Sequence, residues 1–185
     1  MKQFLGRIDL IIGPMFAGKT THLIHLIREY ESKRAKCLVL NHSLDSRYSL
    51  ESLLVSHNNE KIKAKKINKI EEIIIDKSYL MYDVIAIDEA QFFPDITSGC
   101  DFLANNGKIV LASGLDGTFL RKPFNDLINL IPLAENVTKL HSICVKCSAP
   151  ASFTKRISSE EKEILVGSHQ IYQPLCRKCY LNIEN

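Results

Sequence analysis

The stretch GPMFAGKTT, from Gly13 to Thr21, constrains the fold more than any other part of the chain. It matches the pattern G-x-x-x-x-G-K-[ST]. An apolar run, RIDLII at 7–12, precedes it, and apolar residues at helical spacing follow from Leu23 to Tyr30. Strand, loop and helix in this order form a P-loop, whose backbone N–H groups and helix N-terminus face nucleotide phosphates. A chance match in a glycine-rich turn would leave both flanking segments unexplained. The predicted phosphate-binding residues are Gly13, Pro14, Met15, Phe16, Ala17, Gly18, Lys19, Thr20 and Thr21.

Further apolar runs alternate with helix-like segments, which is typical of an α/β fold with a parallel sheet flanked by helices. Strands are predicted at 7–12, 35–40, 82–88 and 107–113, and crossover helices at 68–80 and 96–106. After about Leu140 the pattern changes to short strands around two cysteine pairs. We therefore expect a nucleotide-binding domain over 1–140 and a small C-terminal β lobe over 141–185.

The composition is that of an ordinary globular protein, with 45% hydrophobic and 24% charged residues and a net charge of +3. The densest basic run, between Lys61 and Lys69, is more typical of a solvated segment than of a nucleic-acid site. The N-terminal sequence MKQFLGRIDLIIG lacks a signal-peptide pattern, and no stretch reaches the length of a membrane span. We expect a cytoplasmic protein with neither a nucleic acid nor a membrane as partner.

A second nucleotide-site element is VIAIDEAQFF at 84–93, an apolar strand that ends in Asp88 and Glu89. Ligands bind at the carboxyl ends of parallel strands, and adjacent residues there point in different directions. Asp88 can orient a magnesium ion together with the hydroxyl of Thr20, while Glu89 can accept a proton from an attacking hydroxyl or water. The alternative is a surface acidic pair that caps the next helix.

Two C-x-x-C pairs, Cys144 with Cys147 and Cys176 with Cys179, supply four thiolates for a tetrahedral structural zinc. The stretch between the pairs exceeds the ~15–20 residues that are usual in compact zinc ribbons. Reduced thiols and disulfides are the alternatives. The remaining cysteines, at 37 and 100, are expected to be buried thiols.

Several motifs together carry a resemblance to a known family: GPMFAGKTT, DSRY (45–48), DEAQFFPD (88–95), LDGTFLRKPF (115–124), FTKR (153–156) and the paired C-x-x-C knuckles. In this order, from about Ile11 to Tyr180, they resemble the type II thymidine kinases. The resemblance implies a recombinase-like P-loop fold and a zinc lobe whose lasso loop covers the nucleoside. It implies transfer of the γ-phosphate of ATP to the 5′-hydroxyl of thymidine or deoxyuridine, with magnesium, to make dTMP in pyrimidine salvage for DNA synthesis. It also implies a homotetramer that dTTP inhibits.

Carried over by residue, the resemblance makes Glu89 the general base, while Lys19 and Arg47 stabilise charge on the transferring phosphoryl group. The implied magnesium-side residues are Thr20, Asp45 and Asp88. The implied nucleoside-binding residues are Met15, Gln91, Phe92, Leu115, Phe119, Thr154 and Tyr172. Without the resemblance, core packing would be the better interpretation of the phenylalanines, and we assign Phe93 to the core.

The sequence departs from the family pattern at a few positions. Ala17 stands where serine is common, Ser168 stands where a second glycine is common, and Ser113 with Gly114 replaces an alanine-rich stretch. Two rival functions remain open. DEAQ after a P-loop is also found in helicases, although 185 residues leave room for one motor domain only. A zinc-ribbon binding module would explain the cysteines and lysines but would give Glu89 and the P-loop no task.

Overall fold

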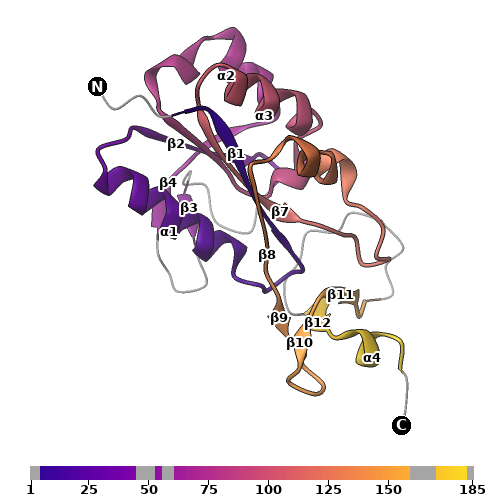
Figure 1. The fold of residues 1–185 in the computed structure, drawn as a ribbon. Helices are drawn as coiled ribbons and strands as arrows, with labels where there is room; N and C mark the ends of the chain where they lie inside the picture. The colour runs from indigo at the N-terminus through magenta and orange to yellow at the C-terminus, as the bar shows by residue number, and fades with distance from the viewer. Residues whose placement is uncertain (1–4, 45–52, 56–60, 159–169, 183–185) are drawn as a thin grey trace.

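The structure is a computed structural model that describes residues 5–44, 53–55, 61–158 and 170–182. Its centre is a six-stranded sheet in which every neighbouring pair is parallel (Figure 1). Across the sheet the strands are β5 (Lys65–Ile67), β2 (Cys37–His42), β6 (Val84–Ile87), β7 (Ile109–Leu115), β1 (Arg7–Gly13) and β8 (Asn136–Lys139). Because β1 lies inside the sheet, the loop that follows Gly13 emerges among neighbouring strand ends.

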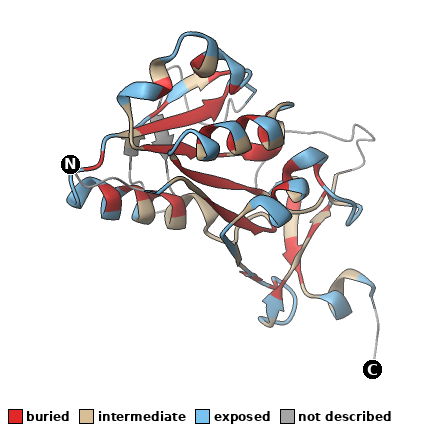
Figure 2. Ribbon diagram, turned by 45° about the horizontal axis from the view of Figure 1, so that its top comes forward, coloured by how far each residue is buried: buried red, intermediate tan, exposed pale blue. Residues whose placement is uncertain are grey.

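Helices cover both faces of the sheet, and the strands are buried between them (Figure 2). Along β1, Ile8, Leu10 and Ile12 belong to one core cluster and Ile11 to the other, as the two-residue period of a strand requires. One face is covered by α1 (Lys19–Ser32). The other is covered by α2 (Glu71–Ile75), α3 (Ile96–Asn105) and the 3-10 segments η1 (Ser78–Met81), η2 (Ala90–Phe92) and η3 (Asn125–Leu133). These layers confirm the predicted parallel α/β fold.

The small lobe lies at the carboxyl edge of the sheet, near the C-terminus (Figure 1). Two antiparallel strand pairs form it: β9 (Ser142–Ile143) with β10 (Pro150–Ala151), and β11 (Phe153–Arg156) with β12 (Tyr172–Leu175). The helix α4 (Arg177–Tyr180) follows β12. A further hairpin joins β3 (Leu53–Val55) to β4 (Lys61–Lys63). The predicted domain boundary at 140 stays a prediction. Within the described part of the chain, no helix is long and apolar enough to cross a membrane.

Several element boundaries differ from those predicted. The helix expected over 68–80 is short, because Lys77 adopts a left-handed φ of 58° and separates α2 from η1. The strand expected at 35–40 runs from Cys37 to His42. The edge strands β5 and β8 were not predicted, since lysine, asparagine and threonine replace the apolar run of a buried strand. Around the second cysteine pair, where short strands were expected, Leu175 ends β12 and Arg177 begins the helix α4.

Candidate active site

The P-loop turns tightly between β1 and α1. Phe16 has a φ of 64°, in the left-handed region that costs a residue with a side chain about 1–2 kcal/mol. Gly18, with a φ of 78°, forms the N-cap of α1, and a glycine adopts this conformation without that penalty. The Lys19 ammonium donates a hydrogen bond of 2.8 Å to the carbonyl of Pro14. The loop therefore curls back on itself, and the Lys19 side chain lies against the backbone of Pro14.

Asp88 lies directly after β6 and faces the first turn of α1. The Thr20 hydroxyl donates a hydrogen bond of 3.0 Å to Oδ2 of Asp88, whose side chain is buried. The two residues are 68 positions apart in the chain, and the parallel sheet brings them together. The structure thus places the predicted magnesium-side hydroxyl and carboxylate in contact.

Glu89 follows with a φ of 48° and a ψ of 42°, a left-handed conformation that is uncommon for a residue with a side chain. This conformation turns the chain from β6 into η2, so that Gln91 lies back against Glu89. The Gln91 Nε2 donates to Oε2 of Glu89 at 2.5 Å, and its Oε1 accepts from the Leu115 N–H at 3.0 Å. Backbone strain of this kind is concentrated at functional sites, which fits the predicted role of Glu89.

Described residues of the small lobe form hydrogen bonds with the P-loop. The Thr154 hydroxyl accepts a hydrogen bond of 3.0 Å from the Met15 N–H, and the Ser142 hydroxyl donates one of 3.1 Å to the Phe16 carbonyl. Thr154 is buried, so its contact with the loop is shielded from water. The lobe and the phosphate loop are therefore joined by hydrogen bonds between residues far apart in the chain.

Aromatic residues of the predicted nucleoside-binding set meet around Arg156. The Arg156 guanidinium lies 3.9 Å from the centre of the Phe119 ring and donates a hydrogen bond of 2.8 Å to the Tyr172 hydroxyl. Both Arg156 and Tyr172 are buried. The Tyr180 hydroxyl, from α4, donates to the Phe119 carbonyl at 2.6 Å. Phe119 is thus held through its ring and its backbone by two parts of the lobe.

The two phenylalanines of DEAQFF have different surroundings. Phe93 is fully buried, which confirms its assignment to the core, and it packs edge-on against His42 with ring centres 4.9 Å apart. Phe92 is half-buried and meets Phe124 edge-on at 6.0 Å. Burial lowers the pKa of His42, so this imidazole is a neutral packing group at neutral pH.

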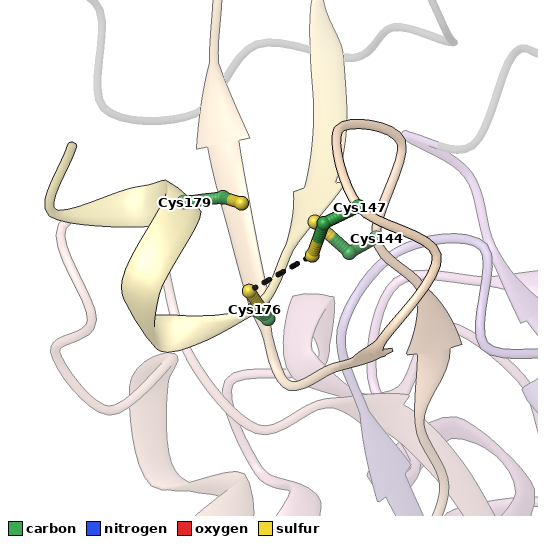
Figure 3. Close-up of side chains that lie close together, drawn as sticks. All are labelled: Cys144, Cys147, Cys176 and Cys179. Carbon is green, nitrogen blue, oxygen red and sulfur yellow. Dashed lines mark hydrogen bonds between the residues drawn. The ribbon is translucent and has the colours of Figure 1, made fainter. Parts of the chain in front are cut away.

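The four cysteines of the knuckles gather in one cluster (Figure 3). Their sulfur atoms lie within 4.8 Å of one another, and Sγ of Cys147 lies 3.6 Å from Sγ of Cys176. Tetrahedral zinc with bonds of about 2.3 Å places its sulfurs ~3.8 Å apart, so the donor set fits a metal of this kind. The Val145 N–H donates to the Pro174 carbonyl at 3.2 Å and ties the two knuckles together.

The thiols of this cluster have unequal environments. Burial raises the pKa of Cys144, but backbone N–H groups of Cys176, Lys146 and Cys147 outweigh it and lower that pKa to about 6. A hydrogen bond with Cys147 raises the pKa of Cys179 to about 12. Several thiolates at such short distances repel one another without a cation, so the cluster is suited to a divalent metal.

The two other cysteines lie in the sheet domain. Cys100 is fully buried in α3, as predicted, and burial raises its pKa. Cys37 is only half-buried at the start of β2, and burial raises its pKa to about 12. Neither thiol is suited to nucleophilic chemistry, because the reactive form is the thiolate.

Comparison with known proteins places the chain in a family. The family model for thymidine kinase matches residues 6–180. A thymidine kinase of Yaba monkey tumor virus (strain VR587) is 48% identical over 185 residues, which is 100% of both chains. A thymidine kinase of Vaccinia virus (strain Western Reserve) is 47% identical over 178 residues, 96% of this chain and 98% of its own. The chain belongs to the thymidine kinase family. Among solved structures, the ATPase DotB of Legionella pneumophila covers 80% of this chain and 44% of its own, with 14% identity and a TM-score of 0.47.

Several residues that the thymidine kinase resemblance assigned to the site are in contact with one another. The structure brings together Thr20 with Asp88, Gln91 with Glu89 and Leu115, and Thr154 with Met15. Two predicted residues, Asp45 and Arg47, lie outside the described residues, as does Ser168.

Sequence reasoning missed residues that contact the predicted site residues and hold them in place. Ser142, Arg156 and Tyr180 each bond or stack with a predicted site residue. Arg156 ends the motif FTKR, and Tyr180 follows Cys179, so both lie next to signals that were recognised. Their partners could not be foreseen, because no local pattern links positions so far apart in the chain.

Proposed function

We propose that the protein transfers the γ-phosphate of ATP to the 5′-hydroxyl of thymidine and of deoxyuridine. The product dTMP would enter DNA synthesis through pyrimidine salvage. Family membership supports the substrate class. The observation that carries the chemistry is the contact between Thr20 and Asp88 at 3.0 Å, with Lys19 and Glu89 next to them in the chain. A P-loop, a magnesium-side carboxylate and a proton acceptor are then grouped at one sheet edge.

The phosphates of ATP would lie on the backbone N–H groups of residues 13–21. Lys19 now donates to the Pro14 carbonyl, and it would exchange this partner for phosphate oxygens when ATP binds. Thr20, Asp45 and Asp88 would hold magnesium, which neutralises charge on the phosphates when it is bound. Arg47 would add a second positive group beside the transferring phosphoryl group.

Glu89 is the proposed general base. The oxygen of the 5′-hydroxyl forms a bond to the γ-phosphorus, the bond from that phosphorus to the β–γ bridging oxygen breaks, and ADP leaves. The hydroxyl proton passes to the Glu89 carboxylate. The left-handed turn at Glu89 and its bond to Gln91 fix where this carboxylate can be. The protein therefore contributes position and charge more than covalent chemistry.

The nucleoside would lie between the P-loop and the lobe. Phe92, Phe119 and Tyr172 supply flat apolar surface for a base, and Met15, Leu115 and Thr154 complete the slot around the 5-methyl group. Arg156 supports this proposal, because it fixes Phe119 and Tyr172 relative to each other. The sequence also assigns Gln91 to this slot, but its side chain is bonded to Glu89 and to the Leu115 N–H.

Zinc is the metal that we propose for Cys144, Cys147, Cys176 and Cys179, since four cysteine sulfurs within 4.8 Å of one another are the donor set of a typical structural zinc site. The metal would hold the two knuckles together and thereby fix the start of α4. Because a metal site of this kind needs thiolates, we also propose a reducing compartment such as the cytoplasm.

We further propose that dTTP inhibits the enzyme and that the active form is a homotetramer. A molecule with a thymidine moiety and three phosphates can occupy the nucleoside slot and the P-loop at once. Such a molecule would inhibit the enzyme by competing with both substrates. Nucleic acid and membranes are not among the proposed partners. Inhibition assays and a molar mass from light scattering check these two proposals.

The test is a transfer assay with γ-labelled ATP and magnesium against thymidine, deoxyuridine, deoxycytidine and deoxyadenosine, with single-stranded DNA as a control. We expect labelled thymidylate and deoxyuridylate and no effect of DNA. Release of free phosphate alone, increased by DNA, would favour the motor-fragment alternative and overturn the proposal. Salt-sensitive DNA binding without ATP turnover would favour the zinc-ribbon binding module.

A further inference from the structure

Gln91, which was predicted to bind the nucleoside, is a polar residue with no exposed surface. Its side chain is engaged at both ends, by Oε2 of Glu89 at 2.5 Å and by the Leu115 N–H at 3.0 Å. A buried amide costs free energy unless its donor and acceptor are both satisfied, and here two site residues satisfy them. The side chain is thus committed to the protein rather than exposed to a ligand.

The orientation of this amide follows from its partners. The Leu115 N–H can only donate, so the oxygen of the Gln91 amide must face it, and the NH₂ group must then face Glu89. A flipped amide would set two donors against each other at Leu115 and two acceptors against each other at Glu89. The backbone of β7 therefore determines which group of Gln91 points at the carboxylate.

The surroundings hold Gln91 in this place. The Asn125 side chain donates to the Gln91 carbonyl at 2.8 Å and ties η2 to the start of η3. At Gly114, a Cβ atom would lie 2.7 Å from the Gln91 Oε1 and 2.6 Å from Leu127 Cδ2. A Cβ atom at 114 would therefore force both the Leu127 side chain and the Gln91 amide to shift, which gives a physical reason for this departure from an alanine-rich pattern.

We propose that Gln91 is a positioning residue for the general base and does not contact the nucleoside. Its amide connects the backbone of β7 to the carboxylate of Glu89 and so holds that carboxylate in one position. Glu89 itself begins the turn, with a left-handed φ of 48°. The inference rests on the proposed function, in which Glu89 accepts the proton of the 5′-hydroxyl. It replaces the assignment of Gln91 to the nucleoside slot.

Kinetics of Gln91→Glu provide the first test. The new carboxylate still accepts from the Leu115 N–H, but it presents an acceptor to Glu89 in place of a donor, so the two carboxylates repel each other. We expect kcat to fall about 10- to 100-fold while KM for thymidine stays within about twofold, because a small displacement of a reacting group has effects of that size. Gln173→Glu makes the same chemical change on β12 and should leave both constants near wild type.

Two further variants keep the test decisive if Gln91→Glu folds poorly. Gln91→Met keeps a side chain of similar length but makes neither hydrogen bond, and Gly114→Ala displaces the amide without removing a polar atom. Both variants should lower kcat and leave KM nearly unchanged. A rise in KM for thymidine with kcat preserved would overturn the proposal, since that result identifies a nucleoside contact. Unchanged constants in all three variants would overturn it as well.

A spectroscopic measurement separates this inference from the proposed function. The side-chain amide resonance of Gln91, identified by its absence in Gln91→Met, should shift in Glu89→Gln because its hydrogen-bond partner changes. An unchanged resonance would show that the contact does not exist. If wild type phosphorylated no nucleoside, the proposed function would fail, while this resonance would still decide whether Gln91 holds Glu89.

Discussion

The main sheet and the small lobe hold their site residues by different physical means. β1 is buried along almost its whole length and carries the P-loop out of a core formed by strands and helices on both faces. Among the described residues of the lobe, the buried hydrophobic cluster is small: Cys144, Ala151 and Leu175, with Cys176, Cys179 and Tyr180 packed against it. A site residue on the sheet therefore keeps its place as long as the domain folds, whereas a site residue in the lobe needs additional support.

That support comes from the cysteine cluster and from contacts with the sheet domain. Small domains with little apolar area to bury usually need metals or disulfides for stability. In this lobe the cluster lies beside α4, whose Tyr180 reaches Phe119, and β11 carries Thr154 to Met15. The lobe is thus tied to the site by a few hydrogen bonds, each of which can be removed singly.

Metal removal should have the largest effect, because it separates the two regions. Structural zinc contributes on the order of 10 kcal/mol to small metal-dependent folds. Hydrogen–deuterium exchange after chelation should show loss of protection over 142–156 and 172–180, with β1 and β6 still protected. ATP binding should persist and thymidine phosphorylation should be lost.

The control for metal removal is Cys37→Ser, a change at a thiol remote from the cluster that should retain metal and activity. If the lobe stayed protected and active after complete chelation, verified by elemental analysis, the difference between the two regions would not depend on metal.

Glu89→Gln should have the next largest effect, and it acts on the sheet side alone. The isosteric amide cannot accept a proton, so we expect kcat to fall about 10²- to 10⁴-fold with the fold and ATP affinity intact. Rapid-quench measurement of the chemical step and a thermal unfolding curve check this. Glu31→Gln, on the exposed side of α1, is the matched control. Near-normal turnover would remove Glu89 from the role of base.

The fold of the sheet side, and the contact between Thr20 and Asp88 at its carboxyl edge, could be predicted because their signals are local. The two-residue period of β1, the P-loop pattern and the acidic pair after β6 each occupy one short stretch, and the parallel sheet brings their ends together. The paired C-x-x-C motifs predicted the cysteine cluster for the same reason. Predictions based on such signals needed no knowledge of tertiary contacts.

What could not be predicted depends on contacts across the chain. Thr154 and Met15 are 139 positions apart, and Gln91 and Leu115 are 24 apart. No periodicity reports that Gln91 is buried or that Arg156 stacks on Phe119. The short edge strand β8 lacked an apolar run because only its pairing with β1, rather than burial on both faces, makes it a strand.

Thr154→Val tests the link between the regions at the P-loop. Valine has nearly the shape of threonine but cannot accept the hydrogen bond from the Met15 N–H, and a donor left unsatisfied in a buried place costs about 1–3 kcal/mol. We expect KM for thymidine to rise about tenfold, which corresponds to about 1.4 kcal/mol, with a smaller change for ATP. Thr138→Val on β8 is the control. Equal changes for both substrates would place Thr154 in support of the P-loop alone.

Tyr180→Phe should have the smallest effect and gives the sharpest view of how the lobe reaches the nucleoside slot. The variant keeps the ring, which lies 5.7 Å from Phe153 and 4.8 Å from the Arg121 guanidinium, and removes only the hydroxyl that bonds the Phe119 carbonyl. One such bond contributes about 0.5–1.5 kcal/mol, so KM for thymidine should rise about two- to tenfold with kcat and metal content unchanged.

The control is Tyr82→Phe, which removes a hydroxyl just before β6, at the amino ends of the strands and so far from the site. Tyr180 follows Cys179 in α4. A rise in KM for thymidine alone would therefore mean that the cysteine cluster shapes the nucleoside slot through Phe119. An effect on ATP of the same size would mean instead that α4 acts on the whole edge of the sheet, and the two regions would be less separable than their cores suggest.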